Sequence, residues 1–263
     1  MPPWSAVLAR HRLISLVALA VLIALAWGWL ISGAGMGMAP AASLFPAGLA
    51  EDPMLAMMMP GDAPWTAVQF AVTFAMWWVM MVAMMLPSAA PMVLLYARAA
   101  PANVRAAAES FILGYLLAWG LFSLIATLMQ WRLATMAMLS PMAMATSSRP
   151  LAAALLIAAG AYQISPWKDA CLRQCRNPAQ FLSRHYRPGW IGALRMGMVH
   201  GAWCVGCCWM LMALLFAGGI MNLAWIALLT LLVALEKLLS WGRALSVAAG
   251  IGCILLGWAI LVG

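Results

Sequence analysis

Seven long apolar segments dominate this sequence and decide what it can fold into. They cover about 13–31, 66–96, 110–131, 150–166, 191–217, 221–240 and 243–262. A transmembrane helix needs about 20 apolar residues to cross the bilayer core. Of the 263 residues, 67% are hydrophobic and 8% are charged, whereas a soluble domain carries about a quarter charged residues. We therefore expect an all-α, polytopic membrane protein with about seven transmembrane helices in a single domain over 1–263.

Three of these segments leave alternatives open. The fourth is short and ends at Ser165-Pro166, so six spans plus a re-entrant segment is a second possibility. The second is overlong and contains Pro87 and Pro91, which predict a kink or a tilt. The first follows Arg10 and Arg12, which could form the charged start of a cleaved signal peptide. Its apolar stretch of about 19 residues is longer than the usual 7–15 of a signal peptide, so we expect a retained anchor, with the cleaved signal peptide as the alternative.

The Lys and Arg residues predict one orientation. With the N-terminus inside, twelve of the 14 lie on the inner side, and only Arg132 and Arg149 lie outside. Cytoplasmic loops of membrane proteins carry such an excess. We therefore expect a cytoplasmic N-terminus and a C-terminus on the outer side, which is the periplasmic side of an inner membrane. The net charge of +8 then reflects insertion into lipid and indicates no nucleic-acid partner.

Methionine is concentrated in the two long outer loops, 32–65 and 132–149. These loops hold ten of the 23 Met residues: Met36, Met38, Met54, Met57, Met58, Met59, Met136, Met138, Met142 and Met144. A thioether is a soft, uncharged ligand that suits Cu(I). The loops are therefore candidates for metal capture, and the alternative is that Met serves there as adaptable packing.

The fifth segment carries a stripe of His and Cys. At about 100° per residue, His200, Cys204 and Cys207 lie within roughly 60° of one another on a helix, with Cys208 close beside them. Met196 is on the same stripe, but about 16 Å from Cys207 along the axis, which is too far for one shared ion. The stripe predicts a soft-metal or redox site. A histidine merely hydrogen-bonded to a neighbouring helix is the alternative.

Neighbouring segments offer further soft ligands. Three Met residues of the second segment, Met76, Met80 and Met84, recur every fourth position and form one face of a helix. Three glycines of the fifth segment allow a neighbouring helix to approach closely and to supply a ligand: Gly197, Gly201 and Gly206. Packing alone also accounts for a Met stripe.

The inner loop 167–190 holds two more cysteines, Cys171 and Cys175, on one side of any helix formed there. We expect the nearby Lys168, Arg173 and Arg176 to lower the pKa of both thiols and so to favour thiolates. The alternative is two incidental cysteines in a basic loop.

Glu236 and Lys237 lie near the inner end of the sixth segment. We expect Lys237 to extend to the interface and Glu236 to orient the His200 imidazole as a carboxylate partner of a metal ligand. A local ion pair between the two residues is the alternative.

Several blocks together resemble a bacterial family described as predicted metal-binding integral membrane proteins. They are M-W-W-V-M-M-V-A-M-M-L-P-S-A-A-P at 76–91, K-D-A-C-L-R-Q-C-R at 168–176, C-V-G-C-C-W-M-L-M at 204–212, and M-N-L-A-W through E-K at 221–237. The resemblance covers roughly 66–240. It implies a polytopic inner-membrane fold with the Cys-rich fifth segment as the metal site, and it implies no reaction.

These patterns favour a non-enzymatic protein that binds and transfers a soft metal ion, with Cu(I) as the best fit and transport as an extension of that role. Membrane lipid and a metallochaperone or cuproenzyme are the expected partners. No P-loop is present to hydrolyse ATP. One alternative is an enzyme, a thiol-disulfide oxidoreductase that passes electrons from the fifth segment to the inner cysteines. Another is a structural subunit or assembly factor of a membrane complex.

Overall fold

The computed structural model describes residues 3–35, 65–99, 107–140 and 144–262, and of these the side chains of 3–15, 99 and 107 are left aside. The described chain is helical, with no strand beyond an isolated bridge between Leu139 and Thr146. The all-α expectation is confirmed for these residues. The helices are α1 Pro3–Ile31, α4 Ala67–Ala99, α5 Ala107–Thr135, α6 Arg149–Ile164, α7 Pro166–Arg176, α8 Pro178–His185, α9 Gly189–Ala213, α10 Leu215–Gly218, α11 Leu223–Leu238 and α12 Gly242–Val262.

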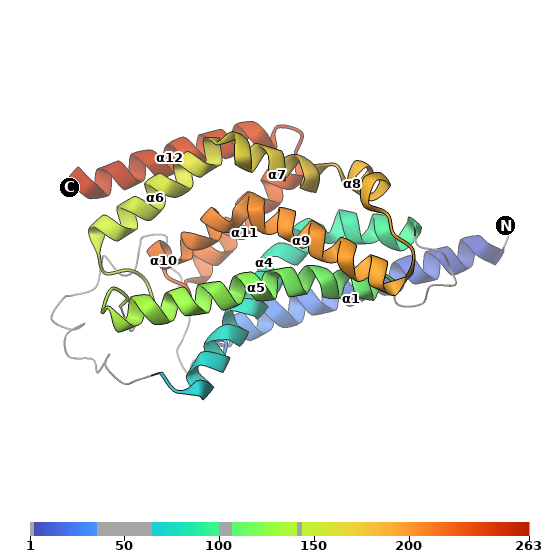
Figure 1. The fold of residues 1–263 in the computed structure, drawn as a ribbon, viewed down its shortest axis with the longest axis horizontal. Coiled ribbons are helices and arrows are strands. Elements are labelled where there is room, and N and C mark those ends of the chain that lie inside the picture. Colours follow the sequence, from blue (N-terminus) through green and yellow to red (C-terminus); the bar gives the residue numbers. More distant parts are fainter. Residues whose placement is uncertain (1–2, 36–64, 100–106, 141–143, 263) are drawn as a thin grey trace.

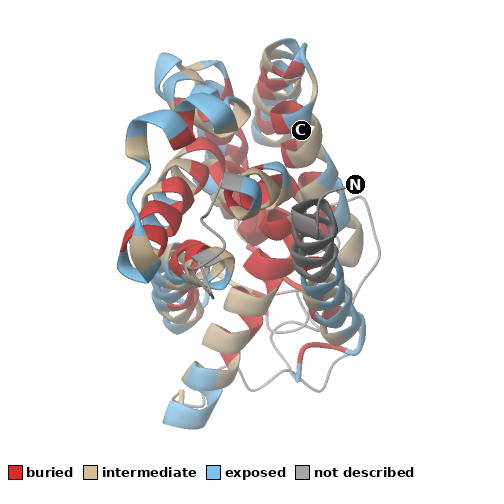
Figure 2. Cartoon of the chain, turned by 90° about the vertical axis from the view of Figure 1, so that its right-hand side faces the viewer, coloured by how far each residue is buried: buried red, intermediate tan, exposed pale blue. Residues whose placement is uncertain are grey.

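Long helices lie side by side and form a bundle, in which α5 packs along α9, α6 along α12, and α1 along α4 (Figure 1). Glycine permits the closest of these approaches. A Cβ built on Gly197 of α9 would lie 2.0 Å from the Phe111 carbonyl oxygen of α5, so only glycine fits there. The expectation that α9 glycines admit a neighbouring helix is confirmed at this position. Buried residues gather at the centre of the bundle and exposed ones at its periphery (Figure 2).

Among the described residues, four helices are long and apolar enough to cross a membrane: Ala67–Arg98, Ala108–Thr135, Gly189–Gly218 and Gly242–Val262. The other three predicted spans also contain helices, but their apolar parts are shorter. They are Leu16–Ile31 of α1, α6 with 16 residues and α11 with 16 residues. The number of spans and their direction therefore remain predictions.

The helix α4 continues through Pro87 and Pro91. Because Pro87 has no N–H, the carbonyl of Ala83 loses its usual helical donor. The indole Nε1–H of Trp27 in α1 donates to this carbonyl at 3.2 Å. A neighbouring helix thus satisfies the carbonyl that the proline frees, as a buried polar group requires.

The predicted inner loop 167–190 is mostly helical, as α7 and α8. Ser165 ends α6 and caps α7, because its hydroxyl accepts a hydrogen bond from the Lys168 N–H at 3.2 Å, and Pro166 occupies the first turn of α7. The turn at Ser165 directs α7 back toward the bundle, where it packs against α9. This placement brings its two cysteines to the centre of the molecule.

Candidate metal centre

Three cysteines of α9 lie at the centre of the bundle, and each is about 1% exposed: Cys204, Cys207 and Cys208. The thiol of Cys207 donates to the Cys204 carbonyl at 3.1 Å, and the thiol of Cys208 donates to the same carbonyl at 2.9 Å. Both sulfurs are therefore turned toward one point on their own helix. The sequence grouped these residues by helical spacing, and the structure places them together.

The helix α7 adds its own cysteines to this group. Cys175 lies beside Cys204 and Cys207, whose thiols interact with its own and raise its pKa. Cys171 packs over Gly206, where an added Cβ would lie 3.0 Å from its sulfur. We call Cys175, Cys204, Cys207 and Cys208 the thiol cluster. The cysteines of α7, which the sequence analysis placed in an inner loop apart from the fifth segment, border and complete the cluster in α9.

Met85 of α4 brings a thioether to the thiol cluster, with its sulfur 3.7 Å from the Cys208 sulfur. This residue lies beside the Met stripe that the sequence singled out. The stripe residues Met76, Met80 and Met84 are fully buried in the same helix, and none has a hydrogen bond to a cysteine in the described part of the chain. The α4 wall therefore touches the cluster through Met85.

Cys204 is also contacted by two polar side chains that sequence reasoning missed. The Lys237 ammonium of α11 donates to the Cys204 sulfur at 2.9 Å and to the Ser88 hydroxyl at 3.1 Å. The Tyr115 hydroxyl of α5 lies 3.0 Å from the same sulfur. The expectation that Lys237 extends to the interface is wrong, because its side chain is buried and directed inward. A lysine within an apolar segment was the available signal.

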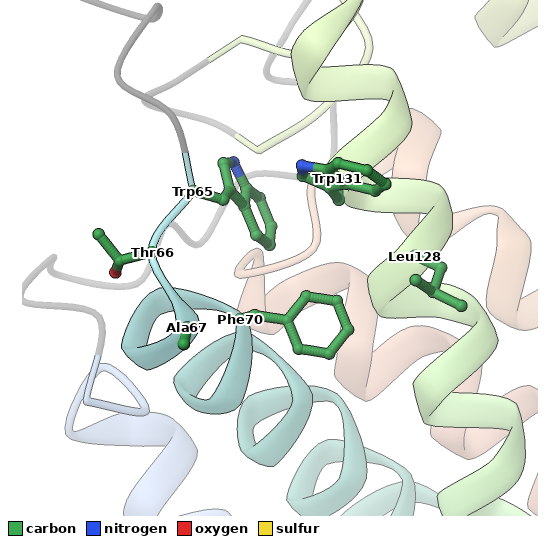
Figure 3. A pocket seen from close by; sticks show the side chains of 6 residues that line it. All are labelled: Trp65, Thr66, Ala67, Phe70, Leu128 and Trp131. Atoms are coloured by element: carbon green, nitrogen blue, oxygen red, sulfur yellow. The ribbon is translucent and has the colours of Figure 1, made fainter.

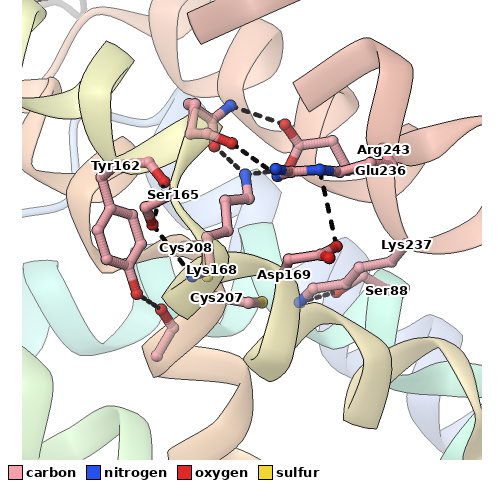
Figure 4. A network of polar contacts seen from close by, with 12 residues as sticks. Ser88, Tyr162, Ser165, Lys168, Asp169, Cys207, Cys208, Glu236, Lys237 and Arg243 are labelled. Carbon is pink, nitrogen blue, oxygen red and sulfur yellow. Dashed lines mark hydrogen bonds and ion pairs between the residues drawn. The ribbon is translucent and has the colours of Figure 1, made fainter. Parts of the chain in front are cut away.

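Glu236 has different partners from those expected. Its carboxylate accepts hydrogen bonds from the Lys168 ammonium at 2.6 Å and from the Gln163 amide at 2.7 Å, and Lys168 also donates to Gln163 (Figure 4). Both carboxylate oxygens are thus engaged away from His200. The local pair with Lys237 is not formed either, because successive residues of a helix point in different directions.

His200 and Met196 lie on α9 before the thiol cluster. The His200 ring is 3% exposed and contacts the rings of Phe111, Tyr115 and Phe181. Its Nδ1 has no hydrogen-bond partner in the part of the chain that the structure describes. The Met196 sulfur accepts a hydrogen bond from the Arg187 N–H at 3.3 Å. Met196 therefore has a local partner in the segment that precedes α9.

The expected lowering of the pKa in α7 is wrong. Burial raises the pKa of the Cys171 thiol, and hydrogen bonds to Cys204 and Cys207 raise that of Cys175. The basic residues act elsewhere: Lys168 pairs with Glu236, and Arg176 donates to the carbonyls of Leu239 and Ser240. Resting thiols in α7 are therefore protonated at neutral pH.

The outer Met loops are only partly visible. Met36, Met38, Met54, Met57, Met58, Met59 and Met142 lie outside the described residues. Of the others, Met136 is exposed, and the Met144 sulfur lies 3.9 Å from the Gln130 amide. A pocket near the start of α4 is lined by aromatic and aliphatic side chains and by Thr66 (Figure 3). It offers no sulfur or imidazole ligand.

The donor set of the thiol cluster is soft, which favours Cu(I) over hard ions. No group of three or more His, Cys, Asp or Glu side chains in the described ranges is arranged as a preformed metal site. The hydrogen bonds from Cys207 and Cys208 to the Cys204 carbonyl account for this, because they turn two thiols toward the backbone. A bound ion would replace the S–H protons and draw the sulfurs together.

Comparison with protein families matches residues 74–261, from within α4 to the end of α12, to PpoB2, described as a copper chaperone. No curated protein and no solved structure matches the chain. The match covers every residue of the thiol cluster, together with Met85 and Lys237. It agrees with the copper-related part of the sequence interpretation, while the membrane part stays a prediction. The chain belongs to the PpoB2 copper chaperone family.

Proposed function

We propose that this protein is a membrane-embedded copper chaperone that holds one Cu(I) ion in the thiol cluster. The single observation that carries the proposal is the convergence of soft ligands from three helices. Cys204, Cys207 and Cys208 come from α9, Cys175 from α7, and Met85 from α4. Thiolates and thioethers are the ligands that select Cu(I). In this proposal the outer Met loops collect the ion, and a cytoplasmic metallochaperone or cuproenzyme exchanges it at α7.

Anaerobic Cu(I) titration against a chromophoric chelator tests this proposal. We expect the purified wild-type protein to bind one ion tightly, and a Cys204→Ser/Cys207→Ser variant to bind at least about 100-fold more weakly, because two anionic ligands are lost. Cys253→Ser is the matched control, since Cys253 lies on α12 apart from the thiol cluster. Equal affinity in the wild type and the double variant would refute the proposed site.

The redox state of the thiols distinguishes the oxidoreductase alternative from the proposed copper chaperone. All six cysteines are free in the structure. Two of the cluster thiols are adjacent on a continuous helix, where a disulfide is strained. Mass spectrometry after alkylation should find every thiol reduced across a range of redox buffers. A disulfide that forms and breaks reversibly would favour the enzyme.

A further inference from the structure

The Lys237 ammonium is buried beside the thiol cluster without a carboxylate partner. Its side chain is 7% exposed, and its hydrogen bonds go to the Cys204 sulfur and the Ser88 hydroxyl. In the part of the chain that the structure describes, the carboxylates in ion pairs are Glu236 and Asp169, and neither pairs with Lys237. A buried charge without an opposite charge is costly.

The other charged side chains near the thiol cluster that form ion pairs already have partners of opposite charge. Lys168 and Glu236 pair at 2.6 Å, with side chains 0% and 2% exposed. Arg243 lies 3.7 Å from Asp169 at a partly exposed position. Figure 4 shows the contact of Lys237 with Ser88 apart from the contacts of the Lys168–Glu236 pair. Among the buried charged side chains that the structure describes, Lys237 therefore carries the one excess positive charge.

Binding of Cu(I) by two thiolates removes this excess. Two S–H bonds break, two Cu–S bonds form, and two protons leave to solvent, with no change of oxidation state. The resulting bis-thiolate complex carries a charge of −1, and the Lys237 ammonium beside Cys204 brings the total to zero. A soft divalent ion such as Cd(II) forms a neutral complex with the same two thiolates. It leaves Lys237 uncompensated.

We propose that Lys237 is the specificity-determining residue of the site: it is the counter-charge that makes the thiol cluster select a monovalent ion, held by Cys204 and one further thiolate. The inference rests on the proposed function and adds to it the charge of the cargo. Soft ligands alone do not separate Cu(I) from Cd(II), because both bind thiolates. A fixed positive charge does separate them, since buried net charge is penalised.

The test compares two substitutions at one position. Lys237→Met keeps most of the side-chain volume and removes the charge, whereas Lys237→Arg keeps the charge. Purified variants are titrated anaerobically with Cu(I) and separately with Cd(II), each against a competing chelator. For Lys237→Met we expect Cu(I) affinity to fall by about 100-fold, the effect of leaving one buried charge unpaired. We expect its Cd(II) affinity to stay unchanged or to rise. Lys237→Arg should keep the wild-type ratio within about threefold.

Equal losses for Cu(I) and Cd(II) in Lys237→Met would show a merely structural role and overturn the inference, as would unchanged Cu(I) affinity. If Lys237→Met does not fold, Lys237→Gln supplies a second neutral variant. Copper X-ray absorption of the wild-type protein is an independent check: two short sulfur bonds are expected, and three would overturn the charge balance. Two other outcomes would refute the proposed function itself rather than the role of Lys237. In one, the wild-type protein binds no Cu(I); in the other, the Cys204→Ser/Cys207→Ser variant binds it with unchanged affinity.

Discussion

His200 occupies a buried position one helical turn before Cys204, among the rings of Phe111, Tyr115 and Phe181. Phe181 also stacks on His185 of α8, with 4.5 Å between the ring centroids. Phe181 thus contacts both a buried imidazole and a half-buried one. Because the Nδ1 of His200 has no hydrogen-bond partner among the described residues, this ring nitrogen is available as a ligand near Cys204. This arrangement fits a role in passing the ion rather than in holding the fold together.

We therefore expect His200→Leu to leave the free energy of unfolding unchanged or about 1 kcal/mol higher, because it removes an unsatisfied buried polar group. Cu(I) stoichiometry should stay the same, while transfer to a chelator slows by about tenfold, which corresponds to about 1.4 kcal/mol on the barrier. Stopped-flow transfer and thermal unfolding measure the two effects. A loss of stability above about 2 kcal/mol, with an unchanged transfer rate, would contradict this role.

Residue spacing could identify part of this centre and could not identify the rest. Cys204, Cys207 and Cys208 are local in sequence, so the helical period alone groups them. The partner of Cys204 is Lys237, 33 residues later, and no period links the two. The contact between Lys237 and Cys204 therefore arises only from the tertiary fold. The same holds for Met85, which lies beside the predicted Met stripe of α4 and whose contact with Cys208 no helical period indicates.

At the scale of elements, α7 is the helix whose position decides whether the thiol cluster is complete. It carries Cys175 to α9, and the buried Lys168–Glu236 pair ties it to α11. A partly exposed ion pair between Asp169 and Arg243 ties it to α12. The sequence predicted helical spacing of the cysteines but placed this segment in an inner loop. Apolar periodicity is weak in a short, charged helix, and the turn at Ser165 that directs α7 inward depends on packing.

Glu236→Gln should release α7, because it leaves the Lys168 ammonium buried without an anion. We expect a loss of about 3–5 kcal/mol in stability. Maleimide labelling of Cys175 should become faster in a Cys171→Ser background. Asp169→Asn is the matched control on the same helix, and it should cost less than about 1 kcal/mol, because that pair is partly exposed and solvent screens it. Denaturant unfolding and labelling rates make the comparison. Equal effects of the two substitutions would argue against a special role for the buried pair.

At the scale of the whole molecule, helices form where each of the seven apolar segments was found, because burial of apolar side chains and helix formation agree along them. Within the described residues, four of the helices are long and apolar enough to cross a membrane. The shorter α6 ends at Ile164, before the turn at Ser165 that leads into α7, and α11 ends at Leu238, one residue after Lys237. The number of crossings therefore stays a prediction.

The orientation of the chain is the last prediction, and it follows from the unequal distribution of Lys and Arg. Ser147 precedes α6 on the predicted outer side, and Ser183 in α8 lies on the predicted inner side; both are exposed. In intact spheroplasts, a membrane-impermeant maleimide should label Ser147→Cys and not Ser183→Cys. After lysis it should label both, and the parent protein gives the background from native thiols. Labelling of Ser183→Cys in intact spheroplasts would reverse the topology. It would place α7, and the exchange of Cu(I) at Cys175, on the periplasmic side.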